Sequence, residues 1–135
     1  MIGLDTSAVI AILQDEPDAT AFLRRIAEAD SVCLSAVSFQ EAAMVLAGRS
    51  NDAAVWQELD ALIMTYSIAI MPYAEDQALI ARDAFLRFGK GRHPARLNWG
   101  DCASYALAKK YNIPLLFKGG DFAHTDIVPA LAAPA

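Results

Sequence analysis

Short apolar runs alternate along this chain with longer segments in which hydrophobic residues recur at helical spacing. Apolar runs predict strands at residues 1–4, 31–34, 67–71 and 115–117, and a short fifth strand at 126–128. The 3.6-residue period predicts helices at 6–13, 18–29, 35–47, 51–66, 74–88 and 99–111. Strands and helices are therefore expected to alternate from one end of the chain to the other.

This alternation favours parallel strands joined by right-handed crossovers. The strands are apolar throughout, which is typical of a sheet whose two faces are both covered. We expect an α/β fold, a three-layer α/β/α sandwich with a central parallel sheet of four to five strands, in a single domain over residues 1–135. The alanine-rich end, from about residue 130 to 135, is expected to be a frayed tail.

Four acidic residues stand where such a fold would bring them together. Asp5 directly follows the first strand, Glu41 lies within the first two turns of the helix after the second strand, and Asp121 follows the fourth strand. Asp101 opens the helix that precedes the fourth strand. Because sites in open parallel sheets lie at the carboxyl ends of the strands, we expect these four side chains to meet at one edge.

Each acid also has an ordinary structural explanation. The pairs Ser38 and Glu41, and Asn98 and Asp101, have the spacing of a capping box, and the other two acids suit helix N-caps. For any one acid alone, capping is the simpler interpretation. Four carboxylates at one edge, however, would repel one another by on the order of several kcal/mol for close pairs. A fold rarely tolerates such repulsion unless cations neutralise it.

Oxygen ligands favour hard divalent cations, so the predicted cofactor is Mg²⁺, with Mn²⁺ as a substitute. Such ions support phosphodiester hydrolysis without a His or Cys nucleophile. His93 and His124 are accordingly interpreted as loop residues. Thr6 and Ser7 are expected to cap the first helix, or to bond a carboxylate or a water on the metal. Asn98 is expected to support the site through its cap.

Composition narrows the class of protein further. Hydrophobic residues make up 56% of the chain, which suggests apolar surface left for a partner or a second copy. The net charge of −5 argues against a general nucleic-acid coat. The start of the chain lacks the basic residues of a signal peptide, and no apolar run is long enough to span a membrane, so a cytoplasmic protein is expected. Cys33 and Cys102 are expected to be buried thiols.

The motifs that carry the acids resemble those of a known family. The segments at 3–8, 38–41, 97–102 and 118–122 have the sequences GLDTSA, SFQE, LNWGDC and KGGDF. In order and spacing they are similar to the VapC-type toxins of the PIN-domain ribonucleases. One departure is Gly120, where many members of that family have Asn.

This resemblance implies a function and partners. It implies a Mg²⁺-dependent endoribonuclease that cleaves structured RNA, such as tRNA or ribosomal RNA, with an acidic quartet formed by Asp5, Glu41, Asp101 and Asp121. It also implies a homodimer, neutralised by a VapB-type antitoxin whose C-terminal segment covers the active site.

A basic segment leads into the third motif. No acid lies between Asp83 and Asp101, and the interval holds four basic residues, Arg87, Lys90, Arg92 and Arg96. We interpret the loop at 89–97 as a contact for RNA phosphates. A solvated loop without a partner, or a dock for an acidic stretch of the antitoxin, remains an alternative.

Trp99 lies within the third motif. It could stack on a base, but the neighbouring Leu97 favours core packing. Trp56 is interpreted as packing on a helix face.

Other classes of protein explain less of the pattern. A phosphoaspartyl receiver domain would need paired acids after the first strand, where Asp5 stands alone. A metal-dependent DNA nuclease would use the same chemistry. A non-catalytic nucleic-acid-binding module acting with its antitoxin would not need all four acids.

Overall fold

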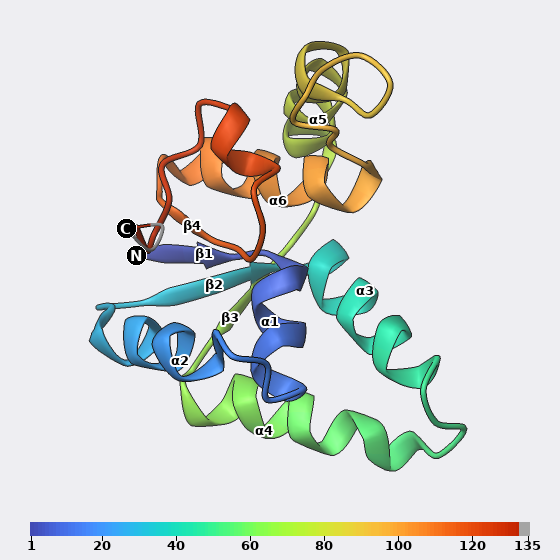
Figure 1. Ribbon diagram of the computed structural model, residues 1–135, viewed down its shortest axis with the longest axis vertical. Coiled ribbons are helices and arrows are strands. Elements are labelled where there is room, and N and C mark those ends of the chain that lie inside the picture. Colours follow the sequence, from blue (N-terminus) through green and yellow to red (C-terminus); the bar gives the residue numbers. More distant parts are fainter. Residues whose placement is uncertain (133–135) are drawn as a thin grey trace.

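The computed structural model describes residues 1–132 and builds them around a sheet of four parallel strands. These are β1 (Ile2–Leu4), β2 (Val32–Ser35), β3 (Ala69–Met71) and β4 (Leu115–Leu116), in the order β3-β2-β1-β4 (Figure 1). In the register of the sheet, Gly3 pairs with Cys33 on one side and with Leu115 on the other. The predicted parallel sheet is confirmed.

The helices agree closely with the hydrophobic periodicity. They are α1 (Thr6–Leu13), α2 (Ala19–Glu28), α3 (Ala36–Ala47), α4 (Gln57–Thr65), α5 (Glu75–Phe88) and α6 (Trp99–Tyr111), with short 3₁₀ helices η1 (Ala53–Trp56) and η2 (Phe122–His124). The one helix predicted over 51–66 is divided between η1 and α4. It ends before Ser67, whose positive φ of 51° turns the chain into β3.

Two hydrophobic cores lie on opposite faces of the sheet. Leu4, Leu34 and Leu116 belong to the core formed with α1, α2 and α4. Leu115 belongs to the core formed with α5 and α6, together with Tyr105 and the segment that follows η2. In Figure 1 the sheet crosses the middle of the molecule, with α1, α2 and α4 on one side and α5 and α6 on the other. The predicted three-layer α/β/α sandwich is therefore confirmed.

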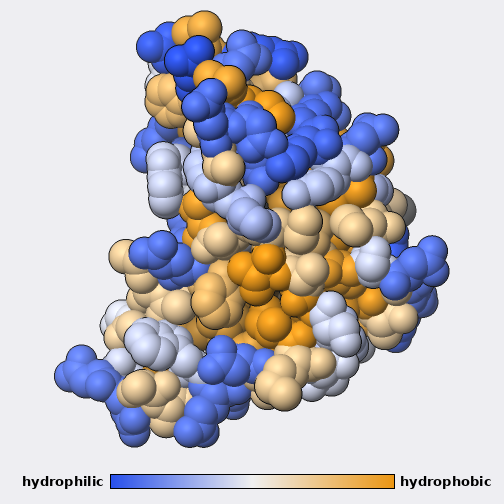
Figure 2. Space-filling model, turned by 180° about the vertical axis from the view of Figure 1, so that it is seen from behind, coloured by the Kyte–Doolittle hydropathy of each residue, from blue (hydrophilic) through white to orange (hydrophobic). Residues whose placement is uncertain are grey.

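The edge strand β3 departs from the prediction that both faces of every strand are covered. Its residues are exposed or half-buried, and Ile70 is 38% exposed. The apolar run predicts the strand correctly but not its burial, which differs from that of β4 at the opposite edge, where both residues are buried. Seen from behind, the molecule carries hydrophobic side chains across the middle of its surface (Figure 2).

The fifth strand predicted at 126–128 is absent from the described residues. Instead Pro129 forms an isolated parallel bridge with Leu115, whose N–H donates to the Val128 carbonyl (3.0 Å). Proline has no N–H to donate, which limits pairing at this position. Ala130, inside the predicted tail, donates to the Leu115 carbonyl (2.9 Å) and accepts from Arg25 Nε (2.6 Å), so it is held in the fold. Residues 133–135 of that tail lie outside the described residues.

The two cysteines, Cys33 and Cys102, are buried and free, as expected. Among residues 1–132, no helix has the length and apolar character needed to cross a membrane.

Helix α6 supports the sheet through residues such as Leu107, which is fully buried, so its packing predicts a clear effect on stability. Leu107→Ala should lower the free energy of unfolding by about 2–5 kcal/mol, because a cavity would remain in the core. The same change at Leu79 on α5, which is 44% exposed, should cost less than about 1 kcal/mol. Urea denaturation of both variants measures this difference, and equal losses would contradict the described packing.

Candidate active site

Asp5 is a buried carboxylate at the carboxyl end of β1. Its backbone N–H donates to the Leu116 carbonyl (2.9 Å), which carries the sheet bonding one residue past β1. Its Oδ2 accepts from both the N–H (3.0 Å) and the hydroxyl (2.5 Å) of Ser7, and its Oδ1 accepts from the Ser104 hydroxyl (2.6 Å). The predicted N-cap of α1 is present. The hydrogen bond from Ser104 of α6 is not part of this cap, and it fixes the direction of the carboxylate.

A network of hydroxyl groups supports Asp5. The Ser7 Oγ also accepts from the backbone N–H of Lys118 (3.0 Å), which ties the loop after β4 to the start of α1. Ser104 shares a hydrogen bond with Ser38 of α3 (3.1 Å), and the Thr6 hydroxyl donates to the Ser38 carbonyl (3.5 Å). Ser38 and Ser104 are fully buried. The hydroxyls therefore link α1, α3 and α6 at the carboxyl edge of the sheet.

Ser104 was not predicted from the sequence as a member of the site. It lies three residues after Asp101 on α6, and Ser38 lies three residues before Glu41 on α3. Residues three apart share a helix face, so this spacing was the available signal.

Glu41 lies in the second turn of α3, and the capping-box interpretation of Ser38 and Glu41 is wrong. The N-cap of α3 is Ser35, whose Oγ accepts from the Val37 N–H (3.2 Å), so Ser38 is already inside the helix. The Glu41 carboxylate lies against Gly100 of α6, where an added Cβ would come within 2.7 Å of Glu41 Oε1. Only a residue without a side chain lets the carboxylate approach α6 this closely.

Asp101 lies at the start of α6, where the predicted capping box is confirmed. Asp101 N–H donates to Asn98 Oδ1 (2.9 Å), and Asn98 N–H donates to Asp101 Oδ2 (3.0 Å). Burial raises the pKa of Asp101 to about 6; the Asn98 N–H opposes this shift, and the charges of Asp5, Asp121 and Glu41 add to it. This pKa shift indicates that the other three carboxylates share the electrostatic surroundings of Asp101.

Asp121 is the exposed member of the group. It occupies the N-cap position of η2 but accepts no capping hydrogen bond, so capping does not account for it. The preceding loop turns at Gly119, whose φ is +94°. Lys118 in this loop directs its ammonium group to Glu16 and Asp18. The lysine nearest in sequence is therefore engaged by other acids.

We refer to Asp5, Glu41, Asp101 and Asp121 as the acidic cluster. None of the four takes part in an ion pair among residues 1–132. Their donor atoms are all carboxylate oxygens, which suit a hard divalent cation. No three acidic, histidine or cysteine side chains in the described chain are already close enough to hold an ion. Binding of an ion would therefore require the acidic side chains to move closer together than they lie here.

His93 and Cys102 are not available as nucleophiles, because the first has a structural role and the second is protonated at neutral pH. His93 packs edge-on against Phe88, with ring centroids 5.2 Å apart, and its Nδ1 accepts from the Ala95 N–H (3.0 Å). Burial raises the pKa of the Cys102 thiol to about 11, so the thiol is neutral at pH 7.

The predicted basic loop is present and is an ordered structure beyond α5 (Figure 1). Gly89 and Leu97 form a bridge that closes it, and Ala95 is buried inside. Its three basic side chains, Lys90, Arg92 and Arg96, are exposed, as is Arg87 in the last turn of α5. Arg87 lies 3.8 Å from Asp83, while Arg92 lies over the ring of Phe85 at 5.9 Å from its centroid.

The predicted core packing of Trp99 is wrong. Its side chain is 70% exposed, because α6 begins at this residue and directs the indole away from the core that buries Leu97. Trp56 is 41% exposed and ends η1, where its Nε1–H donates to the Ala43 carbonyl of α3 (2.8 Å).

Comparison with known proteins agrees with this architecture. Residues 2–128 match the family model of the PIN domain. Ribonuclease VapC28 of Mycobacterium tuberculosis is 48% identical over 129 residues, which cover 95% of this chain and 96% of the relative. Ribonuclease VapC of Mycolicibacterium smegmatis is 46% identical over 124 residues, covering 92% of this chain and 95% of the relative.

Solved structures show the same fold at lower identity. Mycobacterium tuberculosis VapC20, described as a sarcin–ricin loop cleaving toxin, superposes with a TM-score of 0.76 and 20% identity, covering 95% of this chain and 97% of its own. A toxin–antitoxin complex from Klebsiella pneumoniae gives a TM-score of 0.70 at 18% identity, covering 98% of this chain and 100% of its own.

The raised pKa of Asp101 predicts how the metal-free protein responds to pH. A carboxyl whose pKa is higher when folded than when unfolded binds its proton more tightly in the folded state, so its contribution to stability is lost as pH rises through about 6. Asp101→Asn keeps an oxygen for the cap and removes the charge. In chelator at pH 7.5 the variant should be more stable than wild type by about 1 kcal/mol, after allowance for solvent screening.

Thermal denaturation of both proteins between pH 4.5 and 7.5 measures this difference, which should shrink towards the acid end. Asp60→Asn, on the exposed side of α4, controls for the substitution itself. An Asp101→Asn variant less stable than wild type at pH 7.5 would show that the cap outweighs the repulsion.

Proposed function

This chain belongs to the PIN-domain family and is a VapC-type endoribonuclease toxin, and we propose that the acidic cluster is its active site. The observation that carries this proposal is the placement of the acids: Ser104 of α6 holds the Asp5 carboxylate, and the Glu41 carboxylate lies against Gly100, next to Asp101. The four acids come from distant parts of the sequence, and capping leaves Glu41 and Asp121 unexplained. A site that concentrates negative charge in this way is suited to a divalent cation.

Divalent-metal dependence is general in this family, and we propose Mg²⁺ as the ion used here, with Mn²⁺ as a substitute. When bound, such a cation supplies positive charge against the phosphodiester and makes the attacking water more acidic. The residues to hold it are the four carboxylates, with Asp5 as the fixed member. Ser7 and Ser104 orient Asp5 through hydrogen bonds. The Thr6 hydroxyl links α1 to α3 by donating to the Ser38 carbonyl, and the Asn98 side chain caps the first turn of α6, which contains Asp101.

The proposed substrate is RNA, with a structured molecule such as tRNA or ribosomal RNA as the natural target. The nearly full-length relatives are named as ribonucleases, and VapC20 is described as cleaving the sarcin–ricin loop. The exposed Arg87, Lys90, Arg92 and Arg96 of a chain with net charge −5 supply a local positive surface for phosphates.

We also propose an antitoxin of the VapB type as the inhibitory partner and a homodimer as the working form. The likeness to a toxin–antitoxin complex supports the former, and exposed apolar side chains such as Met44, Met64 and Leu86 are available for both contacts. A cytoplasmic site of action follows from the proposed substrate and agrees with two buried, free thiols.

The function is tested by Asp121→Asn, because this exposed side chain carries charge but makes no hydrogen bond within residues 1–132. Wild type should cut RNA with Mg²⁺ or Mn²⁺ and not in chelator, while the variant should be slower by about 100-fold. Asp60→Asn should match wild type. Mapping the new 5′ ends in total RNA, beside a matched DNA strand, identifies the target.

Three results would contradict the proposal. Cleavage of DNA in preference to RNA would indicate a DNA nuclease. Full activity of Asp121→Asn would remove this residue from the site. Metal binding with no cleavage of either polymer would favour a non-catalytic nucleic-acid-binding module.

The basic loop predicts a specific salt dependence. Replacing Arg92 and Arg96 with Ala should weaken RNA binding and lower the slope of log affinity against log salt by about 1 for each phosphate that the loop no longer neutralises. Arg24→Ala, an exposed change on α2, is the control. An unchanged slope would show that the loop is solvated or binds another partner.

A further inference from the structure

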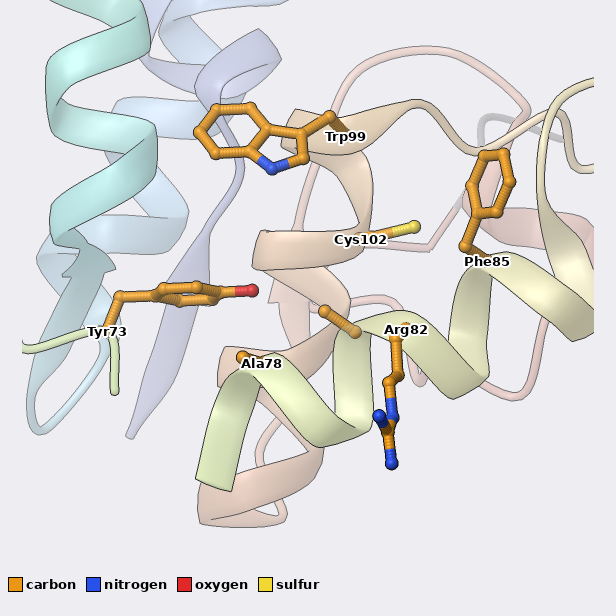
Figure 3. A pocket seen from close by; sticks show the side chains of 7 residues that line it. Tyr73, Ala78, Arg82, Phe85, Trp99 and Cys102 are labelled. Carbon is orange, nitrogen blue, oxygen red and sulfur yellow. The ribbon is translucent and has the colours of Figure 1, made fainter. Parts of the chain in front are cut away.

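A hollow lined by aromatic side chains lies between α5 and the first turn of α6, which also carries Asp101. Its volume is about 420 Å³, and its walls include Tyr73, Phe85 and Trp99, with Arg82 and Cys102. Figure 3 shows the indole of Trp99 and the phenol of Tyr73 on either side of a space, with Cys102 on α6 between them and Phe85 beyond. We call this the aromatic hollow. The acidic cluster does not use these side chains.

The position of Trp99 connects the aromatic hollow with the proposed chemistry. It is the first residue of α6, two residues before Asp101. It also precedes Gly100, against which the Glu41 carboxylate lies. At 70% exposed, its indole contributes little to the core. An exposed tryptophan beside a phosphodiester-cleaving site provides a flat surface on which a base can stack.

The charges around the aromatic hollow suit a nucleotide. Arg82 lies on its rim and extends away from the rings in Figure 3. Arg82, Phe85 and Arg92 also line a second hollow, together with Asp83, so two guanidinium groups flank the Phe85 wall. These cations can hold the phosphates that flank a base.

Two polar side chains line the aromatic hollow, the phenol of Tyr73 and the thiol of Cys102. Burial raises the pKa of Tyr73, so its phenol stays protonated. A phenol and a thiol beside aromatic walls match the edge and faces of an uncharged base.

We propose that the aromatic hollow binds an unstacked nucleobase of the RNA, one or two nucleotides from the bond that is cut. The inference rests on the proposed ribonuclease activity and adds a base-recognition subsite to it. The enzyme then requires a nucleotide that can leave its stack, as in a loop or bulge. A protein partner would use the apolar walls but would leave the guanidinium groups without their phosphates.

The first test uses fluorescence, because the chain has only two tryptophans. Trp56→Phe leaves Trp99 as the sole reporter, and Trp99→Phe leaves Trp56. Both are combined with Asp121→Asn to slow cleavage, and titrated with a short single-stranded RNA that contains all four bases. Saturable quenching is expected for Trp99 and not for Trp56. Equal or absent quenching of the two would overturn the proposal.

The second test removes bases one at a time. In a substrate spanning the mapped cut, an abasic nucleotide at the recognised position should weaken binding to wild type by about five-fold to 150-fold. In Trp99→Ala the same abasic substitution should have almost no further effect, because the stacking partner is already gone. Trp99→Phe should recover part of the loss, and Trp56→Ala should behave as wild type.

The outcomes separate this inference from the proposed function. If wild type cuts RNA but Trp99→Ala cuts the same sites equally fast, with the same loss at every abasic position, the base subsite is wrong and the ribonuclease stands. If no RNA is cut but Trp99 is still quenched, base binding stands and the nuclease assignment fails.

Discussion

The fixed position of the Asp5 carboxylate is the constraint on which the rest of this site depends. Its two oxygens accept from Ser7 on α1, which begins directly after Asp5, and from Ser104 on α6, which packs against β1. A buried carboxylate without such donors would be costly to keep charged. These hydrogen bonds therefore stabilise the ionised Asp5 carboxylate despite the negative charge of the neighbouring acids.

The same contacts that stabilise the helices also position the chemistry. Asp5 caps α1, and Asn98 and Asp101 cap each other at the start of α6, so these side chains have both structural and proposed catalytic roles. Glu41 and Asp121 differ, since neither caps a helix through a side-chain bond. The site thus combines two acids that cap helices with two that do not. Their mutual repulsion is a cost in stability that the fold accepts at a functional site.

The order of strands and helices could be predicted from the sequence, because the buried face of each element requires hydrophobic residues at the spacing of that element. The acids could be placed because parallel strands end at a common edge. The predictions failed for residues whose environment is set by tertiary contacts. Ser38 has a capping spacing but lies inside α3, and Trp99 follows a buried leucine yet lies on the surface. The partnership of Ser104 with Asp5 spans 99 positions, and local patterns carry no such information.

The order of the strands has a consequence for the synthesis of the protein. β1 lies between β2 and β4, so one neighbour of the first strand is made almost at the end of the chain. Asp121 and the backbone amide of Lys118 that holds Ser7 arrive later still. A chain still being synthesised therefore lacks a complete site until the segment that carries Lys118 and Asp121 has been made.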